Sequence, residues 1–262
     1  CIRGDDGDES TMVRGIERFR NYFKDHTDKY VMIGGTACDI AMSQMGLDFR
    51  ATKDLDIVLV VEAVDAEFGS LFWEFVKEGQ YQNKQKSTGK SLFYRFDSPK
   101  DDTYPYMLEL FAREPNILEL LPDSHLTPIP IDEQVSSLSA ILLDDEYYNF
   151  IISGKSLADG LPLILQEYLI PLKAKAYLDL WQIKNDGGRI DSKDLKKHKN
   201  DVFRLYQILS ADVRIPLPES IAYDFRRFLD AIAENPPDVK NFGIRQTSVD
   251  EVLGNLKTVY NL

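Results

Sequence analysis

Apolar residues alternate with polar ones in some stretches and recur every three to four positions in others. This mixture predicts an α/β (α+β) protein with a mixed sheet flanked by helices. After residue 163 the spacing is helical throughout, which predicts a C-terminal helical bundle. The expected strands are 30–33, 54–59, 91–96, 106–112, 126–130, 135–142 and 147–152, and the expected helices are 10–26, 37–45, 66–81, 164–183, 191–210, 218–234 and 248–262.

Breaks in the pattern predict how the chain is organised. The acidic run at 144–146 is expected to form a hairpin turn between the last two strands. Gly154, Gly160 and Pro162 then punctuate a domain border. The expected units are a disordered tail of residues 1–9, a first domain of residues 10–160 and a helical domain of residues 161–262.

Composition narrows the class of function. With 43 acidic and 31 basic residues the net charge is −12, which argues against a broad basic nucleic-acid-binding surface but leaves room for a local groove. The two cysteines, Cys1 and Cys38, provide neither a disulfide framework nor a zinc motif, so a reducing cytoplasm is expected. No apolar run reaches membrane-spanning length, and the acidic start is the opposite of a signal peptide.

The junction between the first expected strand and the helix after it carries a candidate phosphate site. Gly34 and Gly35 would let a phosphate approach the backbone, and Thr36 follows them. A helix N-terminus there would offer unpaired N–H groups and partial positive charge. A Gly-Gly pair alone can also be an ordinary turn, and no Walker-type phosphate loop occurs in the sequence.

Two carboxylates follow on the next expected strand. Asp54 and Asp56 are two residues apart, so they project from one face while Leu55 and Ile57 point to the other. Adjacent acids repel each other unless a cation lies between them, and a hard divalent ion prefers such oxygen ligands. A solvated strand edge is the alternative for the pair alone. A phosphate site beside a metal site predicts phosphoryl or nucleotidyl transfer.

Three further side chains near this region have two interpretations each. Arg50 and Lys53 either contact a triphosphate or neutralise the two acids. Glu109 interrupts an apolar strand, and a buried carboxylate needs a partner. That partner is either a metal ion or an arginine, Arg95 or Arg113.

The order of strand, Gly-Gly-Thr, helix and Asp-x-Asp strand resembles the polymerase-beta-like nucleotidyltransferase superfamily. The resemblance implies a nucleotidyltransferase fold, nucleotide phosphates on Gly34, Gly35 and Thr36, and Mg²⁺ (or Mn²⁺) on Asp54 and Asp56. It also implies a third metal-binding acid on a neighbouring strand, the position of Glu109. The implied reaction transfers an NMP from an NTP to an acceptor hydroxyl (EC 2.7.7 type).

Two expected helices carry motifs that point to one branch of this superfamily. A Lys-x-x-Ala segment at Lys173 and a lysine-rich run ending in Asp201 are similar to the AbiEii-type nucleotidyltransferases, the toxins of type IV toxin–antitoxin systems. The resemblance assigns Lys173 to the nucleotide phosphates and Asp201 to the last motif. The chain departs from the family pattern at Asp179, where an arginine is common, and at His198, where an acid is expected.

The resemblance implies RNA or protein as acceptor and an antitoxin as partner, without membrane attachment. A small-molecule (aminoglycoside-type) nucleotidyltransferase and a nucleotide-binding protein without turnover are the alternatives. The charge of −12 suits a cationic small acceptor, whereas the lysine run at 193–199 suits RNA. Lys173 and Lys175 are two apart on one expected helix, so only one of them can face the cleft.

Overall fold

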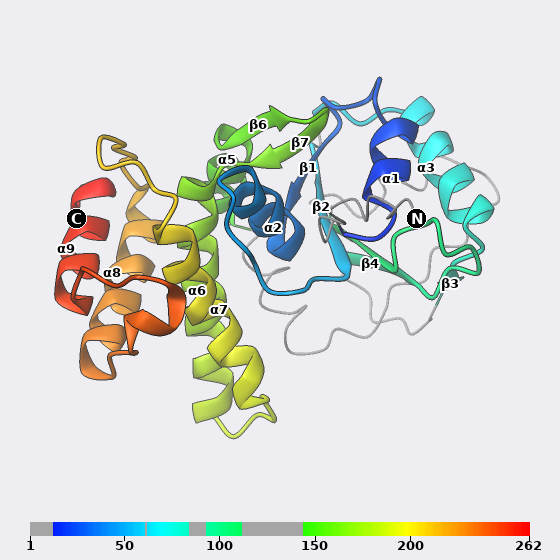
Figure 1. Cartoon of the computed structure of the whole chain (residues 1–262). Helices are drawn as coiled ribbons and strands as arrows, with labels where there is room; N and C mark the ends of the chain where they lie inside the picture. Colours follow the sequence, from blue (N-terminus) through cyan, green and yellow to red (C-terminus); the bar gives the residue numbers. More distant parts are fainter. Residues whose placement is uncertain (1–12, 61, 84–92, 112–143) are drawn as a thin grey trace, which may run out of the picture.

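A seven-stranded mixed sheet forms the centre of the computed structural model, which describes residues 13–60, 62–83, 93–111 and 144–262 (Figure 1). The strand order is β3-β4-β5-β2-β1-β7-β6. β1–β2, β3–β4, β4–β5 and β6–β7 are antiparallel, and β2–β5 and β1–β7 are parallel. The strands are β1 (Tyr30–Ile33), β2 (Asp54–Leu59), β3 (Gln82–Asn83), β4 (Phe93–Asp97), β5 (Met107–Phe111), β6 (Lys155–Ala158) and β7 (Leu161–Ile164).

The register of the central strands places the polar side chains of neighbouring strands side by side. Asp56 pairs with Glu109 of β5 on one side and with Ile33 of β1 on the other. Glu109 pairs in turn with Arg95 of β4. Registered partners share one face of a sheet, so Asp56, Glu109 and Arg95 form a polar row across three strands, β2, β5 and β4.

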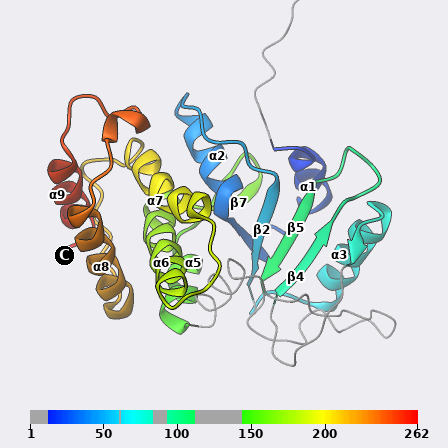
Figure 2. The same cartoon turned by 90° about the horizontal axis from the view of Figure 1, so that it is seen from below.

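The opposite face of the sheet carries the aromatic core. α1 (Ile16–Tyr22) and α3 (Ala66–Glu78) cover this face (Figure 2). Phe72 of α3 meets Phe96 of β4 at a ring-centroid distance of 5.7 Å, and Phe19 of α1 meets Phe75 at 5.6 Å. The residues between the acids of β2, Leu55 and Ile57, are buried, which confirms the predicted alternation of faces. The apolar face of β2 therefore stabilises the strand while its other face is left for polar groups.

Helices of the C-terminal half cover the polar face. α6 (Gln166–Asn185) and α7 (Ser192–Tyr206) pack against each other and against α2 (Gly34–Gln44). α8 (Glu219–Glu234), the short 3₁₀ helix η1 (Val239–Phe242) and α9 (Val249–Val259) complete the bundle farther from the sheet (Figure 1). This arrangement confirms the predicted fold class of a mixed sheet with a C-terminal helical bundle.

The predictions of a strand at 147–152 and of a hairpin turn at 144–146 are wrong. The segment is helix α5 (Asp145–Ser153), and Asp144 caps it by accepting hydrogen bonds from the backbone N–H groups of Glu146 and Tyr147 at 2.8 and 3.1 Å. The acidic run is therefore a helix start, not a hairpin turn. The buried side chains of α5 recur with helical spacing: Tyr147, Tyr148, Phe150 and Ile151.

The glycine-rich stretch expected to be a domain border contains two strands. Asp159 and Gly160 both have positive φ, 49° and 75°, as a tight hairpin turn requires, and they connect β6 to β7. Met32 of β1 pairs in parallel with Leu163 of β7. The sheet thus extends past residue 160, and the helical part begins with α6.

The other expected elements that fall within the described residues agree in type with those observed, apart from their ends. Helix α2 starts at Gly34, three residues earlier than expected, and α1 is shorter than the predicted 10–26. The tail at 1–9 and the strands expected at 126–130 and 135–142 lie outside the described residues, as does Arg113.

The cap of α5 gives a direct test of this correction. Replacing Asp144 with Ala removes two hydrogen bonds to N-terminal N–H groups and should lower the free energy of unfolding by about 1 kcal/mol. Asn149→Ala, at an exposed position inside the same helix, is the matched control and should be neutral or slightly stabilising. Chemical denaturation measures both, and equal losses would contradict the helix assignment.

Candidate functional site

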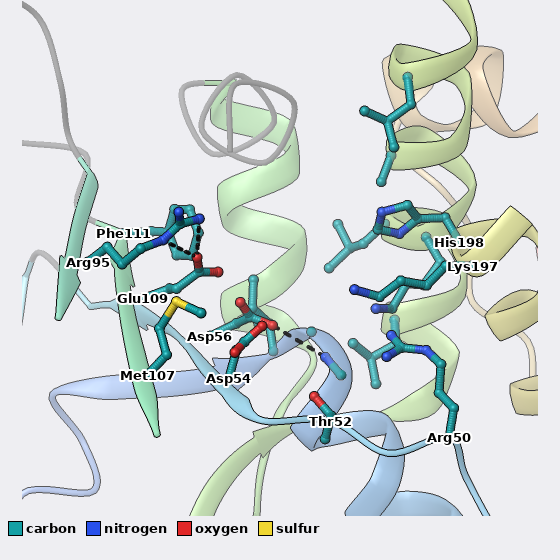
Figure 3. Close-up of a pocket in the computed structure, with 18 residues that line it drawn as sticks. Arg50, Thr52, Asp54, Asp56, Arg95, Met107, Glu109, Phe111, Lys197 and His198 are labelled. Atoms are coloured by element: carbon teal, nitrogen blue, oxygen red, sulfur yellow. Dashed lines mark hydrogen bonds and ion pairs between the residues drawn. The ribbon is translucent and has the colours of Figure 1, made fainter. Parts of the chain in front are cut away.

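A cavity of about 300 Å³ lies between the polar face of the sheet and helices α6 and α7. Carboxylates of Asp54, Asp56 and Glu109 lie on its sheet side, and Arg50, Lys197 and His198 face them from the other side (Figure 3). One face of α6 contributes residues three, four, seven and eleven positions after the first, as helical periodicity requires. These are Leu169, Leu172, Lys173, Ala176 and Leu180.

The acidic wall is built from the row across the central strands. Asp54 and Asp56 project from β2 into the cavity, and Glu109 stands beside Asp56 on β5 (Figure 3). Arg95 donates to Glu109 from Nε at 2.8 Å, and its Nη2 lies 2.6 Å from the same Oε1 atom. The predicted ion pair with Arg95 is thus present, and Glu109 also lies within hydrogen-bonding reach of Asp56. The arginine interpretation of Glu109 therefore describes a contact that it makes, and the metal interpretation stays a prediction.

Crowding of negative charge changes the acidity of this wall. Burial and the neighbouring Asp56 raise the pKa of Glu109 to about 9, against the lowering effect of Arg95. Burial and Asp56 also raise the pKa of Asp54 above its ordinary value, although Lys197 and Arg95 oppose the shift. Without a cation between them, these carboxyl groups disfavour one another's ionised form. A bound cation would reverse that preference.

Gly34 and Gly35, the glycine junction between β1 and α2, lie against the carboxylate of Asp56. Gly34 has φ 71°, and a Cβ atom there would overlap the Asp56 carboxylate. The Gly35 N–H donates to Asp56 Oδ2 at 3.3 Å. The Thr36 hydroxyl is fully buried and donates to the backbone carbonyl of Asp54 at 2.7 Å. Glycine is therefore required for the strand, helix and acid to approach this closely, while Thr36 ties α2 to β2.

A fully buried carboxylate organises the opposite wall. Asp201 of α7 accepts hydrogen bonds from the guanidinium of Arg50, from Nε at 3.0 and 3.3 Å and from Nη2 at 2.9 Å. Lys173 of α6 lies 3.5 Å from the same carboxylate, and Arg204 lies 3.4 Å away. Burial alone would raise the pKa of Asp201, but Lys173 and Arg50 lower it below its ordinary value. Asp201 is therefore ionised and joins the loop before β2 to both helices.

Arg50 does not form an ion pair with either of the two acids, and its contact with a triphosphate stays a prediction. Its guanidinium pairs with Asp201 instead of neutralising Asp54 or Asp56, yet it lines the cavity. Lys53 is exposed, its Nζ lies 5.5 Å from the ring centroid of Tyr106, and it is not among the residues that line the cavity. The structure brings Arg50 to the site and leaves Lys53 outside it.

Lys173 and Lys175 of α6 point in different directions. Lys173 is buried and lines the cavity. Lys175 pairs with Asp179 at 2.8 Å and with Asp224 of α8 at 3.4 Å, away from the cavity lining. Asp179, one of the two departures from the family pattern, is therefore part of a pairing on the far side of α6.

Sequence reasoning missed two contributions of α7 to the cavity. Lys197 lines it, and burial together with Arg50 and Lys173 lowers the pKa of its ammonium group. His198 also lines it, and burial with the charge of Lys173 lowers the pKa of its imidazole to about 3, so the ring is neutral at physiological pH. Helical spacing could have indicated both, because positions 197 and 198 lie four and three residues before Asp201 and so share its face of the helix.

The donor set suits a hard divalent cation in one specific way. Among the described residues, no three His, Cys, Asp or Glu side chains are grouped so that they could hold a metal ion by themselves. Mg²⁺ is commonly bound by only one or two carboxylates together with substrate phosphates and water. Asp54 and Asp56 are oxygen donors on one strand face, beside a helix N-terminus where phosphates can bind. The residues present therefore fit Mg²⁺ bound jointly with a phosphorylated ligand.

Comparisons with known proteins add little to this geometry. No protein-family model matches the chain, and no curated protein matches it in sequence. The chain is similar to a crystal structure of an antigenic nucleotidyltransferase-like protein from Paracoccidioides brasiliensis, with 16% sequence identity and a TM-score of 0.47. The likeness covers 97% of this chain and 94% of that chain. In the part of the chain that the structure describes, no helix combines the length and apolar character needed to cross a membrane.

The close approach at Gly34 predicts an unequal effect of two glycine substitutions. Gly34→Ala and Gly46→Ala both place a side chain at positive φ, 71° and 69°, but only the first overlaps Asp56. Gly46→Ala should cost about 1 kcal/mol of stability through backbone strain, and Gly34→Ala clearly more. Denaturant unfolding of both variants measures the difference. Equal losses would show that Asp56 does not lie against the junction.

Proposed function

We propose that this protein is a metal-dependent nucleotidyltransferase that moves an NMP from an NTP to an acceptor hydroxyl. One observation carries the proposal: a single cavity holds the Asp54/Asp56 pair, the glycine junction at a helix N-terminus, and a cationic wall opposite them. Transfer between phosphates and hydroxyls depends almost entirely on positioning and charge neutralisation, and these three parts supply both.

Each wall of the cavity has a distinct part in the proposed reaction. The N–H groups at the start of α2 would receive phosphate oxygens, where glycine allows close approach. Lys173 and Lys197 reach the same cavity from α6 and α7 and would offset the phosphate charge. Asp201 is fully buried and pairs with Arg50 and Lys173, so it would orient these cations. We therefore assign Asp201 to positioning, away from direct contact with the substrate.

Asp54 and Asp56 would hold Mg²⁺ or Mn²⁺ together with the nucleotide. When bound, the ion would neutralise phosphate charge and favour the ionised form of the carboxylates around it. Glu109 is fixed by Arg95 and stands next to Asp56, so it would complete the oxygen set or accept the proton of the acceptor hydroxyl. Its raised pKa makes it a proton-holding group at neutral pH in the metal-free protein.

RNA or protein is the acceptor that we propose, as for a toxin of the AbiEii type with an antitoxin partner. Lys193 and Lys196 are exposed on α7, whose Lys197 lines the cavity, and would provide a local cationic surface on an acidic protein. A cationic small molecule is the alternative acceptor, favoured by the net charge of −12. Binding of RNA would weaken steeply with salt, because phosphate contacts release counterions, whereas binding of a small cation to an acidic protein would depend on salt far less.

The direct test is incubation with each labelled NTP, Mg²⁺ and separate pools of RNA, protein and small hydroxyl compounds. Label transferred to one pool, with release of pyrophosphate, is the expected result. NTP binding with no transfer to any pool would instead support a nucleotide-binding protein without turnover. Absence of both binding and transfer for all four NTPs would refute the proposal.

The acid pair gives the first prediction for this function. Asp54→Asn and Asp56→Asn should each reduce transfer at least about 10²-fold, since each removes one charged oxygen donor from the site that positions the triphosphate. Asp48→Asn, an exposed acid in the preceding loop, is the matched control and should retain activity. Melting temperatures of all three variants show whether folding is intact. Full activity in a folded Asp54→Asn or Asp56→Asn protein would remove the central claim.

Lys173 and Lys175 of α6 give the second prediction. Lys173→Ala should raise the KM for NTP about 10-fold, because a charge-assisted contact to phosphate is lost inside the cavity. Lys175→Ala should leave that KM unchanged and act only on stability, through the lost pairs with Asp179 and Asp224. Steady-state kinetics with NTP as the varied substrate decides. A larger KM effect from Lys175→Ala would mean that the nucleotide lies on the other face of α6.

A further inference from the structure

His198 is a buried polar group whose function the proposed roles leave unassigned. It belongs to α7, and its ring points into the cavity beside Lys197 (Figure 3). Its Nδ1 atom is buried and has no hydrogen-bond partner within the described protein. A buried unpaired nitrogen is costly, typically by about 1–3 kcal/mol, so its presence in a cavity suggests a ligand that compensates the cost.

The charges around this ring define the chemistry of such a ligand. Positive groups reach the ring from three elements, namely the loop before β2, helix α6 and helix α7, and one carboxylate opposes them. These groups are Arg50, Lys173, Lys197 and Asp201. Three positive charges against one negative charge leave this wall with a surplus of two. A multiply charged anion is the ligand that such a surplus favours.

We propose that His198 is a substrate-positioning residue that hydrogen-bonds to the phosphate groups of the nucleotide, and that it takes up a proton when they bind. This inference rests on the proposed nucleotidyltransferase function. In the free protein the imidazole is neutral and has one N–H to donate. Phosphate oxygens arriving between the cations would cancel the charge that disfavours imidazolium, and a second N–H would then be available to the ligand.

The direction of the pH effect follows from the free protein. Burial and the surrounding cations hold the pKa of His198 at about 3, so the ring binds no proton between pH 6 and 8. A bound phosphate raises that pKa, which means that the complex binds more protons than its separated parts. Affinity for the phosphate ligand should therefore increase as the pH falls, until the pH passes below the pKa in the complex.

The test compares four proteins with two ligands. Wild type, His198→Ala, His198→Gln and the matched control His26→Gln are titrated calorimetrically with ATP and with inorganic tripolyphosphate, at several pH values and in buffers of different ionisation enthalpy. His26 belongs to the segment before β1, where it packs near Phe68 with ring centroids 6.0 Å apart, and it does not line the cavity. Melting temperatures identify variants whose folding is impaired.

The expected result has two parts. His198→Ala should weaken both ligands about 10-fold, the size expected for a hydrogen bond to a charged group. His198→Gln keeps an N–H donor and should recover part of the affinity, but it cannot titrate. It should therefore lose the proton uptake that wild type and His26→Gln both show beyond the ligand's own protonation.

Other results would overturn the inference. Weaker binding of ATP with unchanged binding of tripolyphosphate would place His198 on the nucleoside instead of the phosphates. Unchanged affinity, or equal proton uptake in wild type and His198→Gln, would make the ring a structural residue. In all these cases wild type still binds ATP, so the proposed function survives. If wild type binds neither ligand, the proposed function fails together with this inference.

Discussion

The buried carboxylate of Asp201 is the constraint on which the geometry of the site depends. It is fully buried, and its charge is stable there because Arg50 donates hydrogen bonds to it while Lys173 and Arg204 lie 3.5 and 3.4 Å away. Removal of one partner from a buried pair commonly costs about 3–5 kcal/mol, because an uncompensated charge is left behind. The pair therefore fixes how the loop before β2 lies against α6 and α7. That placement holds the cationic wall opposite Asp54 and Asp56.

Opposite charges on two walls explain why the cavity is both stable and suited to a ligand. The sheet wall has an excess of carboxyl groups, and burial together with the neighbouring Asp56 raises the pKa of Glu109 and of Asp54. The helical wall has an excess of cations, and burial together with these cations lowers the pKa of Lys197 and of His198. Without a ligand, the like charges on each wall therefore repel one another. A cation on the first wall and an anion on the second would relieve both at once, and a metal–nucleotide complex has that charge pattern.

Local patterns predicted the parts of this structure that depend on neighbours in sequence. The alternation of polar and apolar residues in β2 predicted that Asp54 and Asp56 share one face, and the glycines before the next helix predicted the turn at the start of α2. Neither prediction needs a long-range contact. The segment 147–152 was predicted as a strand because its aromatic and β-branched residues favour strands, whereas the Asp144 cap and tertiary packing make it part of helix α5. The pair of Arg50 with Asp201 spans 151 positions, and no local pattern encodes it. Lys197 and His198 joined the site through that same long-range placement of α7.

The two departures from the AbiEii-type pattern have different physical consequences. Asp179 pairs with Lys175 outside the cavity lining, so its charge does not enter the charge balance of the cavity. His198 lines the cavity, and its neutral ring stands where the pattern has an acid. A carboxylate at this position would cancel one of the two surplus positive charges of the helical wall. The neutral imidazole leaves both surplus charges uncancelled. This departure therefore makes the wall more favourable for an anion, and binding of a triphosphate requires that property.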